Sequence, residues 1–506
     1  MRGHSFALCG PLVIDIESRF NPTWRGSSMS EQSSERTVSR REFLKMAGVA
    51  GAALGVGAGL SGILAACGEE ETTTTSTPAT TAGPGTTAGP STTAGPTTSV
   101  SAGVEMGREI KIGAVSPITG ALASFGGPDK WIVSFVLKAV GDGVVCGDGK
   151  KHPISIIQLD TQSSPNRAAE VTQDLLFNEK VDMMVASSSP DTVNPAADQC
   201  EANGVPFLAN FVPWQPFYFG RGATPDKPFK WTWMYHFGVE DAAECRIGMW
   251  DQIETNKKVA YLFPNDADGQ AWFNPEKGLE PFLVKGGYVT GAKPDMYQPP
   301  SEDFTQQISL FKKEGCEICT GNQTPPDFTT FWKQCMQQGY KPKIFSMSKA
   351  LLFHKSIEAV GDIGIGLSDH MVWHPKFPYK SYLTGLTCEE YAAKYTEETG
   401  EQWTQTLGQL GKYEWAIDVL KRVPDIENKE LYIEAIKTTK FEGINGPVDF
   451  TLPVAPGTVR PVPNVYKIKI AGGQWGKSED PRFKYDMYIC YGQDPKMPIQ
   501  KKFEPI

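Results

Sequence analysis

Residues 109–120 read EIKIGAVSPITG, an apolar run that stops at a Ser-Pro pair and continues into a small polar loop. The length of the run and its isoleucine and valine content predict a buried strand. Further strands are expected at 152–160, 181–186 and 206–211, and helices between them at 130–140, 166–178 and 191–203. Strands that alternate with helices are typical of a parallel sheet covered on both faces.

A second alternation begins after residues 231–237, which we interpret as a crossover between two sheets. The expected strands are 258–263, 288–290, 317–320 and 342–345, and the expected helices are 239–254, 270–285, 303–314 and 328–339. After 371–373 the pattern predicts helices at 388–399, 407–423 and 429–438, then a mostly β tail that includes 447–451 and 465–470. The fold class is therefore α/β, with two Rossmann-like lobes and parallel sheets. A cleft at the carboxyl ends of the strands is where such folds bind ligands.

Length and charge narrow the classes of function. The chain has 506 residues and is 40% hydrophobic, which suits more than one domain. Its formal charge of −9 argues against a nucleic-acid partner, because phosphate binding needs a basic surface.

The first hundred residues have the layout of an export signal and a linker. Ser39-Arg40-Arg41 opens a twin-arginine pattern, residues 46–64 are uncharged and apolar, and Leu64-Ala65-Ala66-Cys67 resembles a bacterial lipobox. We therefore predict a twin-arginine lipoprotein signal at 29–66 and a lipidated Cys67. A plain transmembrane anchor is the alternative, and both place the remainder outside the cell membrane, on its outer face or in the periplasm. The Thr/Pro/Gly-rich stretch 67–107 reads as a flexible tether, and 1–28 as a possible non-native start.

Eight cysteines follow Cys67, and outside the cell some of them could pair as disulfides. Sequence leaves their connectivity open. Cys316 and Cys319 form a lone CxxC, which we interpret as a buried strand with small apolar thiols rather than a metal site. No metal or cofactor is expected.

Several segments resemble the branched-chain amino-acid type of ABC-transporter substrate-binding proteins, which have the type I periplasmic-binding fold. Residues 112–126 resemble the opening strand and Pro-x-Thr-Gly loop of that leucine/isoleucine/valine-binding family, and 158–168 resemble its D-x-x-x-x-P-x-x-A strand and helix. Residues 185–189 resemble the G-x-x-x-S loop, with Ala186 in place of the usual Gly. The match runs from about 109 to about 449.

The resemblance implies an exchange of segments between two lobes joined by a multi-strand hinge. Lobe 1 would be 108–233 plus 376–437, and lobe 2 would be 234–375 plus 438–506. It also implies a monomeric receptor that closes on a small-molecule ligand and delivers it to ABC permease subunits, held near the membrane by a lipid anchor.

The ligand is expected at loops that follow buried strands, where free backbone N–H groups and hydroxyls can bind a carboxylate or carbonyl. N-capping of the next helix is the alternative role for these serines and threonines. Aromatic residues near the crossover favour a flat or apolar ligand by stacking, or a cation through the ring quadrupole, although core packing is their commoner role. The predicted ligand-binding residues are Ser116, Thr119, Gly120, Phe125, Ser187, Ser188, Ser189, Phe211, Val212, Trp214, His236, Phe237, Asp268, Trp272 and Gln323.

Two features set this chain apart from the resembled family. Bulky aromatics at 211–219 stand where small residues are usual, and 266–272 looks like the family's Y-G-x-G turn with an acid for the aromatic. These departures speak against branched-chain amino acids and for an amino acid with an aromatic body, or a related small amide or carboxylate. Asp266, Asp268 and Asp327 are candidates to neutralise an ammonium group, with turn or cap roles as the alternative.

Two other classes of function compete with a transport receptor. An enzyme is disfavoured, because no metalloprotease HExxH, nucleophile elbow or phosphate-cradling loop is present, and no catalytic residue is predicted. A ligand-sensing subunit of a signalling receptor would use the same lobes. A fold with a single undivided core, or a crevice already sealed by the protein's own side chains, would overturn the receptor interpretation.

Overall fold

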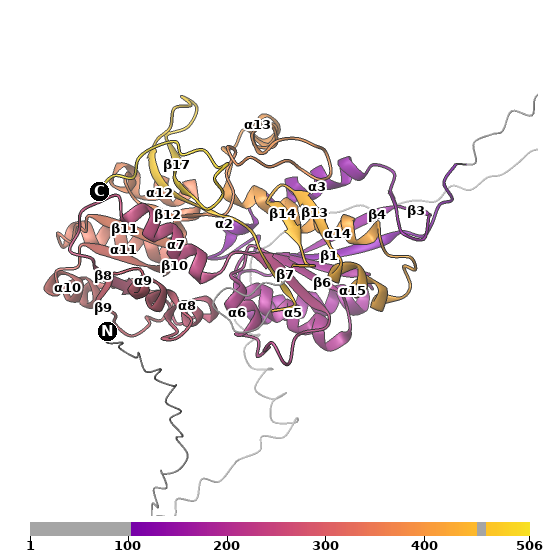
Figure 1. The fold of residues 1–506 in the computed structure, drawn as a ribbon, viewed down its shortest axis with the longest axis horizontal. Coiled ribbons are helices and arrows are strands. Elements are labelled where there is room, and N and C mark those ends of the chain that lie inside the picture. The colour runs from indigo at the N-terminus through magenta and orange to yellow at the C-terminus, as the bar shows by residue number, and fades with distance from the viewer. Residues whose placement is uncertain (1–102, 453–461) are drawn as a thin grey trace, which may run out of the picture. The chain divides into compact units, whose positions relative to one another are not determined.

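The computed structural model describes residues 103–452 and 462–506 (Figure 1). The predicted signal peptide, Cys67, the leading segment 1–28 and the tether up to residue 102 lie outside the described residues. The end of the expected tether is described, and there Met106 forms a parallel bridge with Lys151. Along the described chain, no helix combines the length and the apolar character needed to cross a bilayer.

The first sheet has six parallel strands and confirms the first predicted alternation. In spatial order they are β15 (Val465–Lys467), β7 (Thr232–His236), β6 (Phe207–Asn210), β5 (Met183–Ser187), β1 (Ile110–Ser116) and β4 (Ile154–Asp160). Residues 231–237, interpreted as a crossover, instead form β7 within this sheet. Their near-continuous burial is what a strand covered on both faces requires.

Helices cover both faces of the first sheet. α4 (Pro165–Gln173) and α5 (Pro190–Asn203) pack together on one face, and α3 (Asp129–Val140) and α14 (Leu410–Leu420) pack on the other. α15 (Lys429–Lys437) packs against α14.

The second sheet has seven strands and is only partly parallel. In order they are β17 (Tyr485–Gly492), β16 (Ala471–Lys477), β12 (Ser368–Met371), β11 (Ile344–Lys349), β10 (Ile318–Gln323), β8 (Lys258–Leu262) and β9 (Val289–Ala292). The strands from β12 to β9 are parallel, as expected, whereas β16 and β17 add an antiparallel edge. The helices that pack on it include α7 (Val239–Trp250), α9 (Leu279–Lys285), α10 (Thr305–Lys313), α11 (Pro325–Gln337) and α12 (His354–Val360).

One expected helix is divided. The segment 270–285 forms α8 (Ala267–Phe273) and α9, with a break at Asn274. Asn274 precedes Pro275 and takes an extended ψ of 129°, because the proline ring disfavours a helical conformation in the residue before it.

The chain passes between the two sheets three times: after β7, after β12 and between β15 and β16. The hairpin of β13 (Lys440–Gly443) and β14 (Gly446–Asp449) packs on α14, and β15 pairs with β7. Residues 438–452 and 462–467 therefore belong with the first sheet, whereas the resemblance placed them in lobe 2. Pairing with β15 satisfies the backbone N–H and C=O groups that β7 would otherwise leave without hydrogen bonds at the edge of the sheet. We use "first lobe" and "second lobe" for each sheet with its helices.

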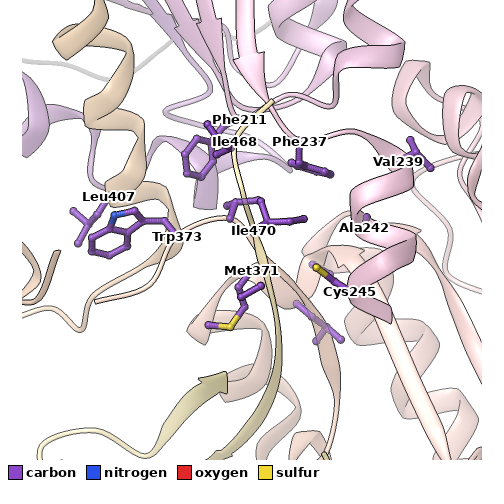
Figure 2. Close-up of a cluster of buried hydrophobic side chains, with 14 of the residues drawn as sticks. Phe211, Phe237, Val239, Ala242, Cys245, Met371, Trp373, Leu407, Ile468 and Ile470 are labelled. Carbon is purple, nitrogen blue, oxygen red and sulfur yellow. The ribbon is translucent and has the colours of Figure 1, made fainter. Parts of the chain in front are cut away.

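A single buried cluster continues through the passages between the sheets. Figure 2 shows Ile468 and Ile470, which follow β15, near Phe211 and Phe237 of the first lobe and Met371 at the end of β12. All eight cysteines after Cys67 are buried free thiols, so the pairing left open by the sequence does not occur in the structure. Cys319 lies on β10 and Cys316 just before it, which confirms the buried-strand interpretation.

Candidate functional site

The carboxyl ends of the parallel strands of both sheets meet at an inner cavity of about 30 Å³. That volume holds about two water molecules, which is far less than a ligand pocket needs. Its lining residues are, from the first lobe, Phe125, Ser188, Pro190, Phe211, Pro213, His236 and Phe237, and, from the second, Asp268, Trp272, Ser348, Lys349, Leu352, His370 and Val372.

Aromatic rings form a continuous wall from one lobe to the other. The centroid of His236 lies 4.7 Å from that of Phe211 and 5.0 Å from that of Phe237. Phe237 in turn lies 4.5 Å from His370, which stacks on Trp272 at 6.1 Å. Such a wall suits a flat ligand, because offset and tilted ring contacts are favourable.

His236 is the polar group of this wall that lacks a partner. Its side chain is buried, and neither ring nitrogen has a hydrogen-bond partner. Burial, and then the charge of His370, lower the pKa of His236 well below its ordinary value, so the imidazole is neutral near pH 7. A neutral imidazole offers one N–H donor and one acceptor to a bound group.

His370 is held by a network on the second sheet. The registers of β10, β11 and β12 align Asn322, Ser348 and His370 in one row across three strands. His370 Nδ1 lies 2.8 Å from Asp369 Oδ1, and the same oxygen accepts from the buried Arg246 at 3.0 Å. Arg246 also lies 5.4 Å from the Trp272 ring, so the network positions both rings of this side of the wall.

Lys349, a lining residue of the inner cavity, contacts three aspartates. Its ammonium contacts Asp191 at the start of α5 at 3.2 Å, Asp266 at 3.2 Å and Asp268 at 3.4 Å. Asp191 also accepts from the backbone of Ala267 at 3.0 Å. These contacts join the two lobes directly beside the cavity.

An apolar plug lies between the inner cavity and an outer groove. It consists of Leu122, Phe125, Leu352 and Phe353, with the Phe125 and Phe353 rings edge to face at 4.9 Å. On its far side lies an outer groove of about 970 Å³, whose lining includes Trp131, His354, Tyr395, Trp403 and Phe483. Within residues 103–452 and 462–506, no His, Cys, Asp and Glu side chains form a group able to hold a metal ion.

The predicted site residues divide into two groups. Seven of them line the inner cavity: Phe125, Ser188, Phe211, His236, Phe237, Asp268 and Trp272. The other eight do not line it: Ser116, Thr119, Gly120, Ser187, Ser189, Val212, Trp214 and Gln323.

Local hydrogen bonds account for several members of the second group. The Thr119 hydroxyl is exposed and donates to Asp160 at 2.7 Å. The Trp214 indole is buried and donates to Glu240 at 2.9 Å. Ser189 caps α5, and Asp266 caps α8 by accepting from Gly269 at 2.6 Å, so the capping alternative applies to both. Asp327 instead accepts from Tyr297 at 3.0 Å, away from the cavity.

Sequence reasoning missed the contribution of β11 and β12: Ser348, Lys349, Leu352, His370 and Val372. It also missed Pro190 and Pro213, each beside a residue that it did select. The available signal was position, because these residues lie at or just after the carboxyl ends of parallel strands, as Ser188 and Phe211 do.

Two α/β lobes, three passages between them and a cavity at the facing strand ends define a type I periplasmic binding fold. A family profile described as periplasmic binding protein matches residues 109–473, and a twin-arginine translocation signal profile matches residues 37–57. The chain belongs to the periplasmic binding protein family, and its signal directs it out of the cytoplasm. A comparison with curated proteins gives no match.

Solved structures share the fold at low sequence identity. The leucine-binding protein LivK of Thermotoga maritima is 17% identical with a TM-score of 0.59, over 76% of this chain and 99% of that one. An ABC-transporter solute-binding protein of Rhodopseudomonas palustris in complex with 3,4-dihydroxybenzoic acid is 20% identical with a TM-score of 0.58, over 76% and 99%. Another from R. palustris in complex with benzoate is 14% identical with a TM-score of 0.55, over 78% and 99%.

Proposed function

We propose that this protein is the extracytoplasmic receptor of an ABC importer and that it captures a small aromatic carboxylate between its lobes by hinge closure. The observation that carries the proposal is the wall of rings around His236, whose two nitrogens have no partner. An aromatic body would stack between the lobes, and the carboxylate would accept the N–H of His236. No catalytic step is proposed.

Capture requires the lobes to open first. The inner cavity of about 30 Å³ is smaller than any aromatic acid, because Lys349 and the rings fill it. A crevice sealed by the protein's own side chains was expected to overturn a receptor, but here the side chains that fill it come from both lobes and would separate with them. A solute that contacts both lobes binds the closed form more tightly than the open form, and that difference drives closure.

An amino acid, the first ligand suggested by the sequence, fits the site less well. Its ammonium would need a free carboxylate, but Asp191, Asp266 and Asp268 already contact Lys349. The fold alone does not distinguish an amino acid from an aromatic carboxylate, since proteins of similar structure were solved with isoleucine and with benzoate. His236 could donate to the carboxylate of either solute, so it is the engagement of the three aspartates by Lys349 that favours a solute without an amino group.

The setting of the receptor is also part of the proposal. Cys67 would carry lipid, and the tether would let a monomeric receptor reach permease subunits while staying near the membrane. A tether of this kind raises the effective concentration of the receptor at its partner.

Calorimetry with benzoate, 3,4-dihydroxybenzoate, leucine and isoleucine tests the solute class on the purified chain. We expect the two aromatic acids to bind and the two amino acids to fail. His236→Phe keeps a ring in the wall but removes the hydrogen bond, so affinity for benzoate should fall by roughly ten- to a hundredfold.

His152→Phe is the matched control, because His152 is also buried but pairs with Asp148 at 2.9 Å and does not line the cavity. It should leave benzoate affinity unchanged. Binding of leucine without benzoate, or equal affinities in the wild type and His236→Phe, would contradict the proposal.

A further inference from the structure

Three carboxylates converge on one ammonium beside the inner cavity. Asp191 reaches it from the first lobe, and Asp266 and Asp268 reach it from the start of α8 in the second. Lys349 is only 4% exposed and lines the cavity together with Asp268. Burial alone would lower the pKa of Lys349, but the charges of the three aspartates raise it well above its ordinary value, so the ammonium stays charged.

The backbone holds this ammonium at a conformational cost. Lys349 ends β11 in register with Gln323 and has a φ of 70° and a ψ of −63°. A positive φ is unfavourable for a residue with a Cβ and persists only where the surroundings enforce it. Strain of this kind gathers at ligand sites, which separates Lys349 from an ordinary surface lysine.

Another lysine, which is partly buried, shows what a purely structural ion pair looks like in this fold. Lys467 on β15 contacts Glu240 at 2.8 Å and Asp241 at 2.7 Å, but it does not line the inner cavity. The Lys349 cluster differs because it faces the same cavity as the unpaired His236.

We propose that Lys349 determines specificity by occupying, from within the chain, the place that a solute's ammonium group would take. The receptor then accepts solutes without an amino group and excludes those that carry one. The inference rests on the proposed function, since it assumes that solutes enter the inner cavity.

Electrostatics supply the reason for exclusion. An incoming ammonium would have to share the three carboxylates with the ammonium of Lys349. Two positive charges that contact the same carboxylates repel each other strongly in a buried site. A solute without an amino group meets no such repulsion. Removal of the lysine charge would leave three carboxylates ready to bind a cation.

The test removes the positive charge of Lys349 and follows the thermal unfolding of the protein in the presence of benzoate or 2-phenylethylammonium. Lys349→Met keeps the length of the apolar stem and removes the ammonium. In this variant 2-phenylethylammonium should raise the unfolding midpoint by about 2 °C or more, whereas the wild type should show no shift with it.

Lys467→Met is the matched control and should gain no response to 2-phenylethylammonium. If Lys349→Met does not fold, the double variant Lys349→Met, Asp191→Asn removes one buried carboxylate with the cation and serves for the same measurement. Equal responses of variant and wild type to 2-phenylethylammonium would overturn the role of Lys349. Failure of the wild type to bind benzoate would instead overturn the proposed solute class, so the two failures are distinguishable.

Discussion

His374, just after β12, shows how burial of one residue makes stability depend on pH. Its Nδ1 accepts from the Lys376 backbone at 3.0 Å, and its Nε2 lies 3.1 Å from the Met487 carbonyl. Burial is the main cause that lowers the pKa of His374 to about 4, although the nearby Asp486 partly opposes it. Between pH 6.5 and 4 the unfolded chain therefore binds a proton that the folded chain does not.

The free energy of unfolding should fall as the pH falls through this window. From pH 6.5 to 5, the proton on unfolded His374 costs the folded state about 2 kcal/mol. His374→Gln removes that contribution. Between pH 6.5 and 5, the free energy of unfolding should therefore fall by about 2 kcal/mol less in His374→Gln than in the wild type. Chemical denaturation at both pH values measures the difference, and parallel profiles for the two proteins would contradict the argument.

Two short elements close the cavity from opposite lobes. α2 (Ala123–Gly126) carries Phe125, and the 3-10 turn Ala350–Leu352 leads into Phe353. Leu352 and Phe125 face the inner cavity, whereas Phe353 faces the outer groove. The apolar plug is thus positioned to stabilise the closed form, since its contacts cross between lobes.

Phe353→Ala should weaken closure without unfolding the chain. Loss of the ring contact and its buried area destabilises the closed form by roughly 1.5–3 kcal/mol, so benzoate should dissociate roughly ten- to a hundredfold faster. Stopped-flow fluorescence measures this rate. Phe483→Ala, which removes a ring that lines only the outer groove, is the control, and equal rates in both variants would exclude the plug as a barrier.

At the scale of the whole molecule, the proposed function assigns capture of the solute to the two lobes and attachment to the membrane to the N-terminal segment. The three passages between the sheets carry the buried cluster around Ile468 and Ile470, which makes them the natural hinge of the two lobes. In the proposed function, attachment would fall to Cys67, which follows the twin-arginine signal and precedes the described part of the chain.

Cys67→Ser should release the receptor. A serine cannot take a thioether-linked lipid, so we expect the variant to be exported but to appear in the soluble extracytoplasmic fraction, with benzoate affinity intact. Fractionation and metabolic labelling with a fatty acid measure this. A variant that stays with the membrane would favour the uncleaved apolar anchor over a lipid.

The sequence predicted the elements well because their signals are local. The run from Ile110 to Ser116, the alternation that follows it and the twin-arginine pair each depend on residues close together in the chain. Seven cavity residues were also found, because strand ends can be read from the same alternation. The broken helix at Asn274 shows a local signal that was overlooked, since Pro275 was visible in the sequence.

The amino-acid sequence by itself therefore determined the α/β class, the export signal and the loops at the strand ends, since backbone preferences and apolar periodicity act over a few residues. Only the tertiary structure decided that β15 joins β7, that Lys349 meets Asp191 across the lobes and that His236 lies without a partner beside His370. Those relations join residues more than a hundred positions apart, and they depend on sheet order and side-chain packing, which no local pattern encodes.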